Sequence, residues 1–243
     1  KNQRTKLREN KMKRIILLTL ACSLGIAQTA FAEYQFEVKR GGQQAIKLTF
    51  DEYFGEVNYK SGGVNFEAMR IGNETSTHRF VFYGDPANWG WENDKELKMR
   101  WRTFLEKINN HIEDWTHSSA GDVISWKDGD EEKYRYIHLY EFKASDEKAF
   151  NAAHDKIVKK LSPIIGDREV GFGTYEIGGY GGATHWVVVT AESFSDYMII
   201  KREMAKNEKA WGKYYDERGK VEYIRNYTLQ SIKRYSYKEN NEK

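Results

Sequence analysis

The stretch Val64–Gly72 (VNFEAMRIG) recurs 106 residues further on as Val170–Gly178 (VGFGTYEIG). A Thr-His pair follows each copy and opens an apolar run, Thr77-His78 in the first and Thr184-His185 in the second. A spacing of this size fits a domain-sized unit and is too long for a solenoid repeat. The repeat therefore predicts two similar half-domains related by a pseudo-twofold axis.

Hydrophobic periodicity predicts the same order of elements around each copy: strand, helix, strand, strand, helix, strand. In the second copy the strands are expected at 134–143, 170–177, 185–190 and 229–235, with helices ending near 165 and running from 194 to 211. In the first copy we expect strands at 36–39, from 64, from 78 and at 123–127, with helices over 46–57 and 97–115. Matching the first strands at an offset of 104 makes Tyr34 the counterpart of His138.

This order is the split β-α-β, ferredoxin-like motif. The chain resembles the dimeric α/β-barrel superfamily, which includes antibiotic-biosynthesis-type monooxygenases and stress-responsive barrel proteins. The resemblance implies an α+β fold in which two ferredoxin-like repeats, residues 33–130 and 131–243, pack sheet to sheet as an intrachain pseudo-dimeric α/β barrel. It implies a tandem fused duplication. It rests on element order and the internal repeat, so no functional residue is transferred from the family.

Residues 1–32 have the features of a leader with a secretory signal peptide. Met12, the expected start, precedes Lys13-Arg14, an apolar run over 15–26 and an A-x-A site, which predicts cleavage after Ala32. The only cysteine, Cys22, lies in this segment, so residues 33–243 have no disulfide and no thiol. We expect a bacterial periplasmic or secreted protein with no membrane span once the leader is removed.

Removal of the leader changes the charge. It carries seven of the 39 Lys and Arg and one of the 36 Asp and Glu, so residues 33–243 hold 32 basic and 35 acidic residues, a net charge of −3. A basic surface is the first requirement for binding nucleic acid. Nucleic acid is therefore not an expected partner.

Three histidines are candidate catalytic residues. His78 and His185 occupy equivalent strand positions, and strand alternation places His78 on one face with Phe80 and Phe82. If that face lines the barrel, both imidazoles approach one cavity as general bases or ligands. The alternative is that each Thr-His pair only ends a hairpin. His138 lies among strand tyrosines, as a proton-transfer group or a satisfied buried histidine, and His154 is expected on the surface.

Aromatic side chains on or beside the strands predict a cavity for an apolar or aromatic molecule, or alternatively a filled core. The expected ligand-binding residues are Tyr34, Phe80, Trp126, Tyr140, Tyr175 and Trp186. No metal-binding motif is present in the sequence, and haem is open as a cofactor without being required.

Three functions remain open at this stage. The first is an exported small-molecule-binding protein with its ligand between the repeats, as a monomer or homodimer. The second is a cofactor-independent or haem-dependent, monooxygenase-like oxidoreductase that uses the same cavity. The third is a structural or interaction protein with a filled barrel.

Overall fold

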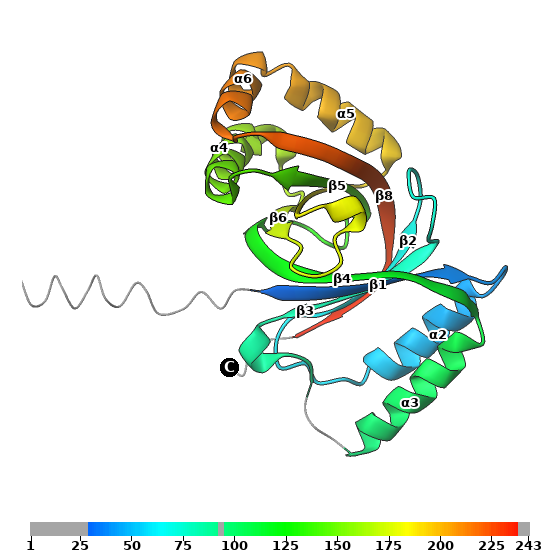
Figure 1. Ribbon diagram of the computed structural model, residues 1–243. Helices are drawn as coiled ribbons and strands as arrows, with labels where there is room; N and C mark the ends of the chain where they lie inside the picture. Colours follow the sequence, from blue (N-terminus) through cyan, green and yellow to red (C-terminus); the bar gives the residue numbers. More distant parts are fainter. Residues whose placement is uncertain (1–28, 92–94, 238–243) are drawn as a thin grey trace, which may run out of the picture.

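The computed structural model describes residues 29–91 and 95–237. Within these ranges the chain forms five α-helices and one closed antiparallel barrel of eight strands (Figure 1). The expected leader, with Cys22, lies outside the described residues except for 29–32. No described helix has both the length and the apolar character needed to cross a bilayer.

The first half of the chain runs from β1 to β4. Its elements are β1 (Ala30–Val38), α2 (Gln43–Phe54), β2 (Gly63–Met69), β3 (His78–Gly84), the short helix η2 (Pro86–Asn88), α3 (Lys95–Asn109) and β4 (Ile112–Lys127). The second half comprises β5 (Tyr136–Ala144), α4 (Glu147–Ile165), β6 (Val170–Thr174), η3 (Tyr180–Gly182), β7 (His185–Ala191), α5 (Phe194–Ala205), α6 (Glu208–Glu217) and β8 (Val221–Ser236).

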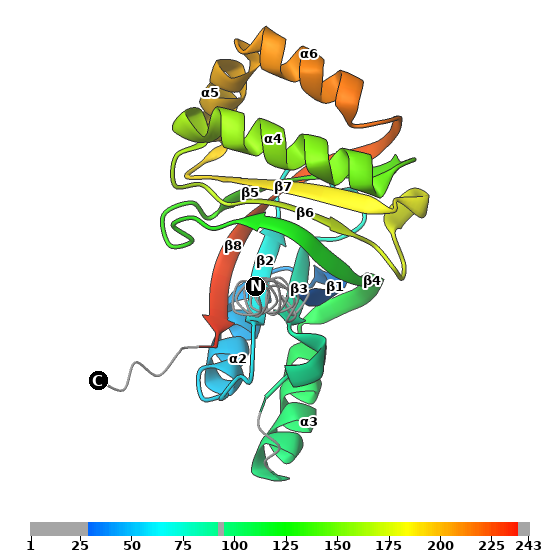
Figure 2. The same cartoon turned by 90° about the vertical axis from the view of Figure 1, so that its left-hand side faces the viewer.

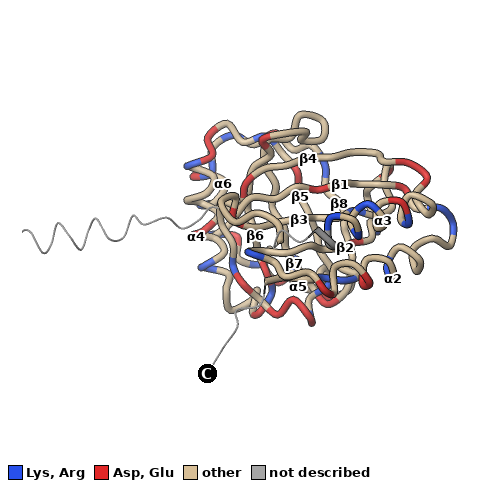
Figure 3. Tube along the Cα trace, turned by 90° about the horizontal axis from the view of Figure 1, so that it is seen from below, with Lys and Arg blue, Asp and Glu red and all other residues tan. Residues whose placement is uncertain are grey.

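The strands follow the order β1-β3-β2-β8-β5-β7-β6-β4 around the barrel, which closes between β4 and β1. The two halves meet through β2 with β8 and through β4 with β6. Both junctions are hydrogen-bonded strand pairs, so the expected α+β barrel within one chain is confirmed, as a single closed sheet. The helices lie outside it, with α2 and α3 on one side and α4, α5 and α6 on the other (Figure 2). Acidic and basic residues are interspersed along the trace (Figure 3).

Three predicted elements differ from the structure. The helix expected at 97–115 is α3, which ends at Asn109. Ile112 and Trp115 belong instead to β4, a strand of 16 residues that also includes the expected strand 123–127. The helix expected from 194 to 211 is two helices, α5 and α6, which meet around Asn207. The last strand starts at Val221 instead of Leu229. The long β4 and β8 have the extra length because each pairs with strands of both halves.

The register of β1 also differs from the expected one. Phe36 pairs with His78 on β3, as Phe142 pairs with His185 on β7. The equivalent first strands are therefore offset by 106 residues, so Tyr34 corresponds to Tyr140 and His138 corresponds to Ala32. The predicted match of Tyr34 with His138 was wrong by two residues.

Each strand has one face toward the helices and one toward the barrel interior. Phe36, Phe66 and Phe80 pack with Ile46 and Phe50 of α2 in the core between sheet and helices. Side chains on the opposite face of the strands, such as Phe31, Leu139 and Val188, form a different cluster inside the barrel. A strand buried on both faces is consistent with the near-continuous burial of β2 and β6.

Candidate functional site

The barrel interior contains buried charges that the sequence analysis did not predict. Arg79 lies between two carboxylates, with Nη1 2.6 Å from Glu33 Oε2 and Nε 2.6 Å from Glu67 Oε2. Glu33 also accepts hydrogen bonds from Ser119 Oγ and Gln35 Nε2. All these side chains are buried. Burial alone would lower the pKa of Arg79, but Glu67 and Glu33 outweigh it and raise that pKa well above its usual value, so the guanidinium stays charged.

A second cluster of buried polar side chains lies inside the barrel, next to the first. Glu141 accepts hydrogen bonds from Arg225 and from the hydroxyls of Tyr175 and Tyr227, at 2.9 Å for Tyr175 and 3.3 Å for Tyr227. Burial raises the pKa of both tyrosines well above the usual range, so both remain protonated donors. Tyr175 was predicted to bind ligand, and its hydroxyl is instead already bonded within the protein.

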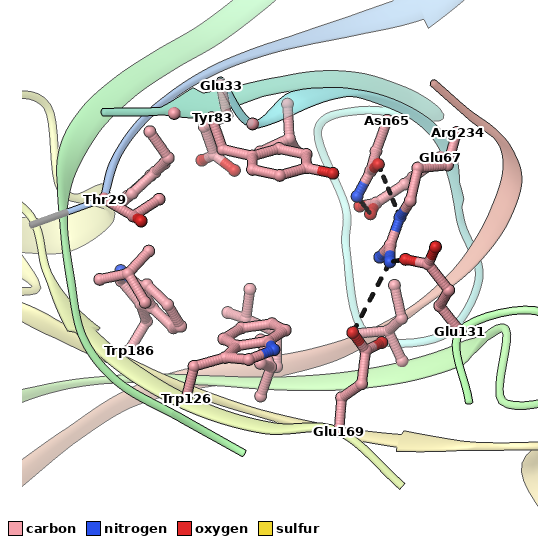
Figure 4. Close-up of a pocket in the computed structure, with 18 of the residues that line it drawn as sticks. Thr29, Glu33, Asn65, Glu67, Tyr83, Trp126, Glu131, Glu169, Trp186 and Arg234 are labelled. Carbon is pink, nitrogen blue, oxygen red and sulfur yellow. Dashed lines mark hydrogen bonds and ion pairs between the residues drawn. The ribbon is translucent and has the colours of Figure 1, made fainter. Parts of the chain in front are cut away.

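An open cavity of about 550 Å³ lies inside one end of the barrel. We call it the barrel cavity. Trp126 and Trp186 lie on one side of it, and Asn65, Arg234 and Glu131 lie on the opposite side (Figure 4). Three of the six aromatic residues expected to bind ligand, Trp126, Tyr175 and Trp186, thus line a cavity between the two halves of the chain.

The polar side of the barrel cavity is arranged around Arg234. Its Nε donates to Asn65 Oδ1 at 2.9 Å, its Nη1 contacts Glu131, and Glu169 Oε1 lies 3.6 Å away. Burial, with repulsion from Asp128 and Glu67, raises the pKa of Glu169 to about 7. Glu169 is therefore poised between its neutral and charged forms near neutral pH.

His78 and His185 do not share a cavity. His78 lies on the helix-facing side of β3, with Nε2 2.9 Å from Gln43 Oε1 of α2 and Nδ1 3.0 Å from Thr77 Oγ1. His185 lies in the equivalent layer of the second half, with Nδ1 2.6 Å from Thr184 Oγ1. Alternation places both imidazoles outside the barrel, under different helices. The shared-cavity arrangement is therefore not what the structure has, and burial lowers the pKa of both histidines, that of His78 to about 4.

His138 also faces the helices. Its Nε2 lies 2.8 Å from Asn226 Oδ1, and its ring contacts the rings of Tyr140 and Tyr197 at centroid distances of 4.2 and 4.4 Å. Burial lowers its pKa to about 4. It is therefore a neutral, hydrogen-bonded side chain within a cluster of tyrosines.

The remaining predicted ligand-binding residues lie apart from the barrel cavity. Tyr34 is 44% exposed, and Phe80 is buried in the core of the first half. Tyr140 lines a second cavity of about 670 Å³ between the second-half sheet and helices α4, α5 and α6. We call this second space the helix–sheet cavity. Its walls are mostly apolar and include Ile157, Leu161, Val187 and Met204.

His154 on α4 lines the helix–sheet cavity and is only 4% exposed, so its expected surface position was wrong. Neither ring nitrogen has a hydrogen-bond partner among the described residues. Asp155 Oδ1 is 3.6 Å from Nδ1, too far for a hydrogen bond. Burial lowers the pKa of His154, which keeps the ring neutral. The sequence does hold a signal for this position, because Phe150, His154, Ile157 and Leu161 recur at helical spacing.

The two halves contain the same aromatic cluster. Phe36, Phe66 and His78 stack in the first half, and Phe142, Phe172 and His185 stack in the second. Against the first cluster lies Phe50, whose ring is 5.6 Å from that of Phe66. Against the second lies His154, whose ring is 5.6 Å from that of Phe172. A histidine without partners thus stands where the first half has a phenylalanine.

The described residues contain no group of three or more His, Cys, Asp or Glu placed to hold a metal ion. His154 has unpartnered ring nitrogens, one of which could bind the iron of haem, next to an apolar cavity. The residues present are therefore compatible with haem, although haem is only one of the groups that would fit.

No protein-family model and no curated protein sequence matches the chain. Several solved structures share its fold. A candidate monooxygenase from Fusobacterium nucleatum subsp. nucleatum has a TM-score of 0.58 at 17% identity, over 88% of this chain and all of that one. A candidate monooxygenase from Lactobacillus acidophilus has a TM-score of 0.56 at 11% identity, over 86% of this chain and 96% of that one.

A chlorite dismutase variant from Candidatus Nitrospira defluvii, in complex with cyanide, gives a TM-score of 0.52 at 9% identity, over 84% of this chain and 91% of that one. The TM-scores above 0.5 at these identities show a likeness of fold. The chain therefore shares the α+β barrel fold of these three structures.

Proposed function

We propose that the protein binds a small, largely apolar molecule in the helix–sheet cavity of the second half, with His154 as the polar contact. The observation that carries this proposal is the difference between equivalent positions. Phe50 completes a layer of closely packed rings in the first half, whereas His154 faces a cavity of about 670 Å³ with both nitrogens unpartnered. A buried polar group without a partner is destabilising, which favours a ligand that supplies the partner.

The lining of the helix–sheet cavity indicates what the ligand is like. Apolar side chains supply most of its surface. Its charged lining residues are Lys201, Arg218 and Glu208, so positive charge exceeds negative by one. Arg218 stacks on Tyr215 with 4.8 Å from Cζ to the ring centroid, and its Nε has no hydrogen-bond partner among the described residues. The ligand therefore has an apolar or aromatic body and an acidic group near Arg218.

Titration with anilinonaphthalene sulfonate, an apolar dye with one anionic group, tests this proposal. The unaltered protein should enhance the dye's fluorescence with a saturable, one-site isotherm. His154→Phe, which introduces the residue of the equivalent first-half position, should abolish that site. His111→Phe, the same change outside both cavities, should leave it intact. Equal dye binding by all three proteins would refute the proposed site.

An oxidoreductase that uses the same cavity is the second candidate function. It is supported by the unpartnered nitrogens of His154 and by the shared fold with candidate monooxygenases and chlorite dismutase. His154 would hold haem through a ring nitrogen, and haem would supply the redox chemistry. Addition of haemin should then give a Soret band that His154→Phe shifts or removes. A spectrum identical to that of free haemin in both proteins would eliminate the haem-dependent form.

Three further features belong to this proposal. The halves descend from one duplicated ferredoxin-like unit, which the repeated ring cluster and the repeated Thr-His contacts support. The protein is exported to the periplasm or beyond, which residues 12–32 support through their signal-peptide pattern. A single chain closes the barrel, so the smallest functional unit is a monomer.

A further inference from the structure

The barrel cavity is built around two indole rings. Gly171 and Gly173 of β6 let these rings lie directly against the strand. A Cβ on Gly171 would be 2.3 Å from the ring of Trp126, and a Cβ on Gly173 would be 2.3 Å from that of Trp186. No other residue type fits at either glycine without moving an indole. Trp126 is 42% exposed, so much of its surface is available to a ligand.

The same cavity has an excess of negative charge. Six acidic residues and two arginines line it: Glu33, Glu67, Asp85, Asp128, Glu131 and Glu169, with Arg79 and Arg234. Arg79 is shared by two carboxylates, and so is Arg234. Each arginine therefore balances only one of its two partners. The acidic residues outnumber the arginines, so the lining of the cavity has a net negative charge.

Glu169 is a buried carboxyl group of this cavity with only a long contact to a cation. It is 6% exposed, and its side-chain oxygens accept no hydrogen bond from the described residues. Its nearest cation, Arg234, is 3.6 Å away and already contacts Glu131. Figure 4 shows Glu169 beside Trp126, with its carboxyl directed across the cavity toward Arg234. Its raised pKa has the same origin, since burial and the nearby Asp128 and Glu67 disfavour another negative charge.

We propose that the barrel cavity is a second binding site, specific for an organic cation with an amine or quaternary ammonium group on an aromatic or apolar body. The body packs on Trp126 and Trp186, and the positive charge lies toward Glu169. Indole faces attract cations as well as apolar groups, and a buried carboxylate is stabilised by an added positive charge. An anionic ligand would meet the same excess of negative charge and be repelled.

This site is distinct from the helix–sheet cavity, whose charged lining has the opposite sign, and it does not depend on that cavity being occupied. A metal ion is a poorer match than an organic cation. Four of the six carboxylates of the barrel cavity are paired with Arg79 or Arg234, and the described residues contain no group of three or more potential ligands placed to hold one metal ion.

Three probes that share an indole body test the charge preference by calorimetry: tryptamine (positive), tryptophol (neutral) and indole-3-acetate (negative). Tryptamine should bind at least about tenfold more tightly than tryptophol, which reflects one cation–π contact and one carboxylate partner. Indole-3-acetate should bind most weakly. Equal affinities for tryptamine and tryptophol, or no binding of tryptamine, would overturn the proposal.

Glu169→Gln keeps the shape of the side chain and removes its charge. It should bring tryptamine close to the affinity of tryptophol and leave tryptophol unchanged. Glu106→Gln on the exposed face of α3 is the matched control and should change neither. Should Glu169→Gln fail to fold, Asp128→Asn at the rim of the cavity should weaken tryptamine alone by a smaller factor. Unchanged tryptamine affinity in the folded Glu169→Gln or Asp128→Asn protein contradicts the inference.

Discussion

His154 stands against Phe172 as Phe50 stands against Phe66, with the two rings of each pair 5.6 Å apart. In the first half, the layer between helix and sheet is packed with aromatic rings, as expected where the side chains serve only stability. Phe50 continues into a set of ring contacts with Phe54 and Phe80. His154 has unpartnered nitrogens and a cavity beside it. A residue that makes the fold less stable than the residue at the equivalent position indicates a functional constraint at its site.

His154→Phe should therefore stabilise the protein in the absence of ligand. The change removes two buried, unsatisfied nitrogen atoms, and leaving such a group without a partner is destabilising by about 1–3 kcal/mol. Urea unfolding should show a free energy of unfolding higher by about 1 kcal/mol or more. The reciprocal variant Phe50→His should lose several kcal/mol, because it places an unpartnered ring in a closely packed core. Loss of stability by both variants would show that the second layer is not hollowed for a ligand.

The fold was predictable from the sequence to the level of elements and their order, and the site was not. Alternation groups His78 with Phe80, but both faces of a barrel strand are buried, so the pattern cannot say which one faces the helices. The two-residue error at Tyr34 has a related cause, because a shift of two positions preserves alternation. Glu33, Glu67 and Glu141 alternate with apolar residues as solvent-facing ones do, which hid the charged interior.

Arg79→Met should strongly destabilise the barrel. The substitution leaves Glu33 and Glu67 buried without their cation, and breaking a buried ion pair in this way is destabilising by about 3–5 kcal/mol. Chemical unfolding of Arg79→Met beside the triple variant Arg79→Met, Glu33→Gln, Glu67→Gln separates charge from packing. The triple variant should recover much of the loss. A triple variant as unstable as the single one would mean that the side-chain shape of Arg79, and not its charge, holds the barrel.

The buried histidines should make the protein sensitive to mild acid. His78 and His138 have folded-state pKa values of about 4, below the usual 6.5. Their neutral forms are thus favoured by folding. This stabilisation is complete above about pH 6.5 and is lost as the pH falls toward 4, with an upper limit of about 3 kcal/mol for each histidine.

The pH dependence is best measured as the free energy of unfolding between pH 7.5 and 4.5, with Glu169→Gln as the background. Glu169 acts in the opposite direction, because its raised pKa makes folding less favourable as the pH rises from about 4.5 through about 7. Removing its titration isolates the histidines. A flat profile below pH 6.5 in that background would contradict their neutral, buried state.

Gly173→Ala should be more damaging than Gly171→Ala. The added Cβ at Gly173 meets the backbone oxygen of Asp122 at 2.2 Å as well as the buried ring of Trp186, so little can move. At Gly171 the obstacles are the half-exposed ring of Trp126 and a valine methyl group, which can shift. We expect a loss of about 1–3 kcal/mol or more at Gly173 and less at Gly171. Gly171→Ala should still weaken tryptamine binding, measured by calorimetry, because it displaces one wall of the barrel cavity. Equal losses of stability at both glycines would argue against the two different environments.

Processing of the precursor after Ala32 would alter the barrel cavity. Residues 30–32 form the start of β1, paired with β3 and β4, and the buried ring of Phe31 lies 5.6 Å from that of Trp186. A chain that begins at Glu33 lacks Phe31 and Thr29 from the cavity wall. It should unfold at a lower temperature than a chain that begins at Ala30, because removal of a buried phenylalanine side chain is destabilising by about 3–5 kcal/mol.

The chain from Ala30 with Phe31→Ala is the matched control for this comparison by scanning calorimetry. It should lose most of the same stability while keeping the strand intact. Tryptamine should raise the unfolding temperature of the Glu33 chain more than that of the Ala30 chain, because its body occupies the space that Phe31 leaves beside Trp186. A Glu33 chain as stable as the Ala30 chain without ligand would mean that Phe31 contributes nothing to the barrel. A smaller ligand-induced shift in the Glu33 chain than in the Ala30 chain would contradict this expectation. It would mean that the positively charged amino terminus created at Glu33 already balances the negative charge of the cavity.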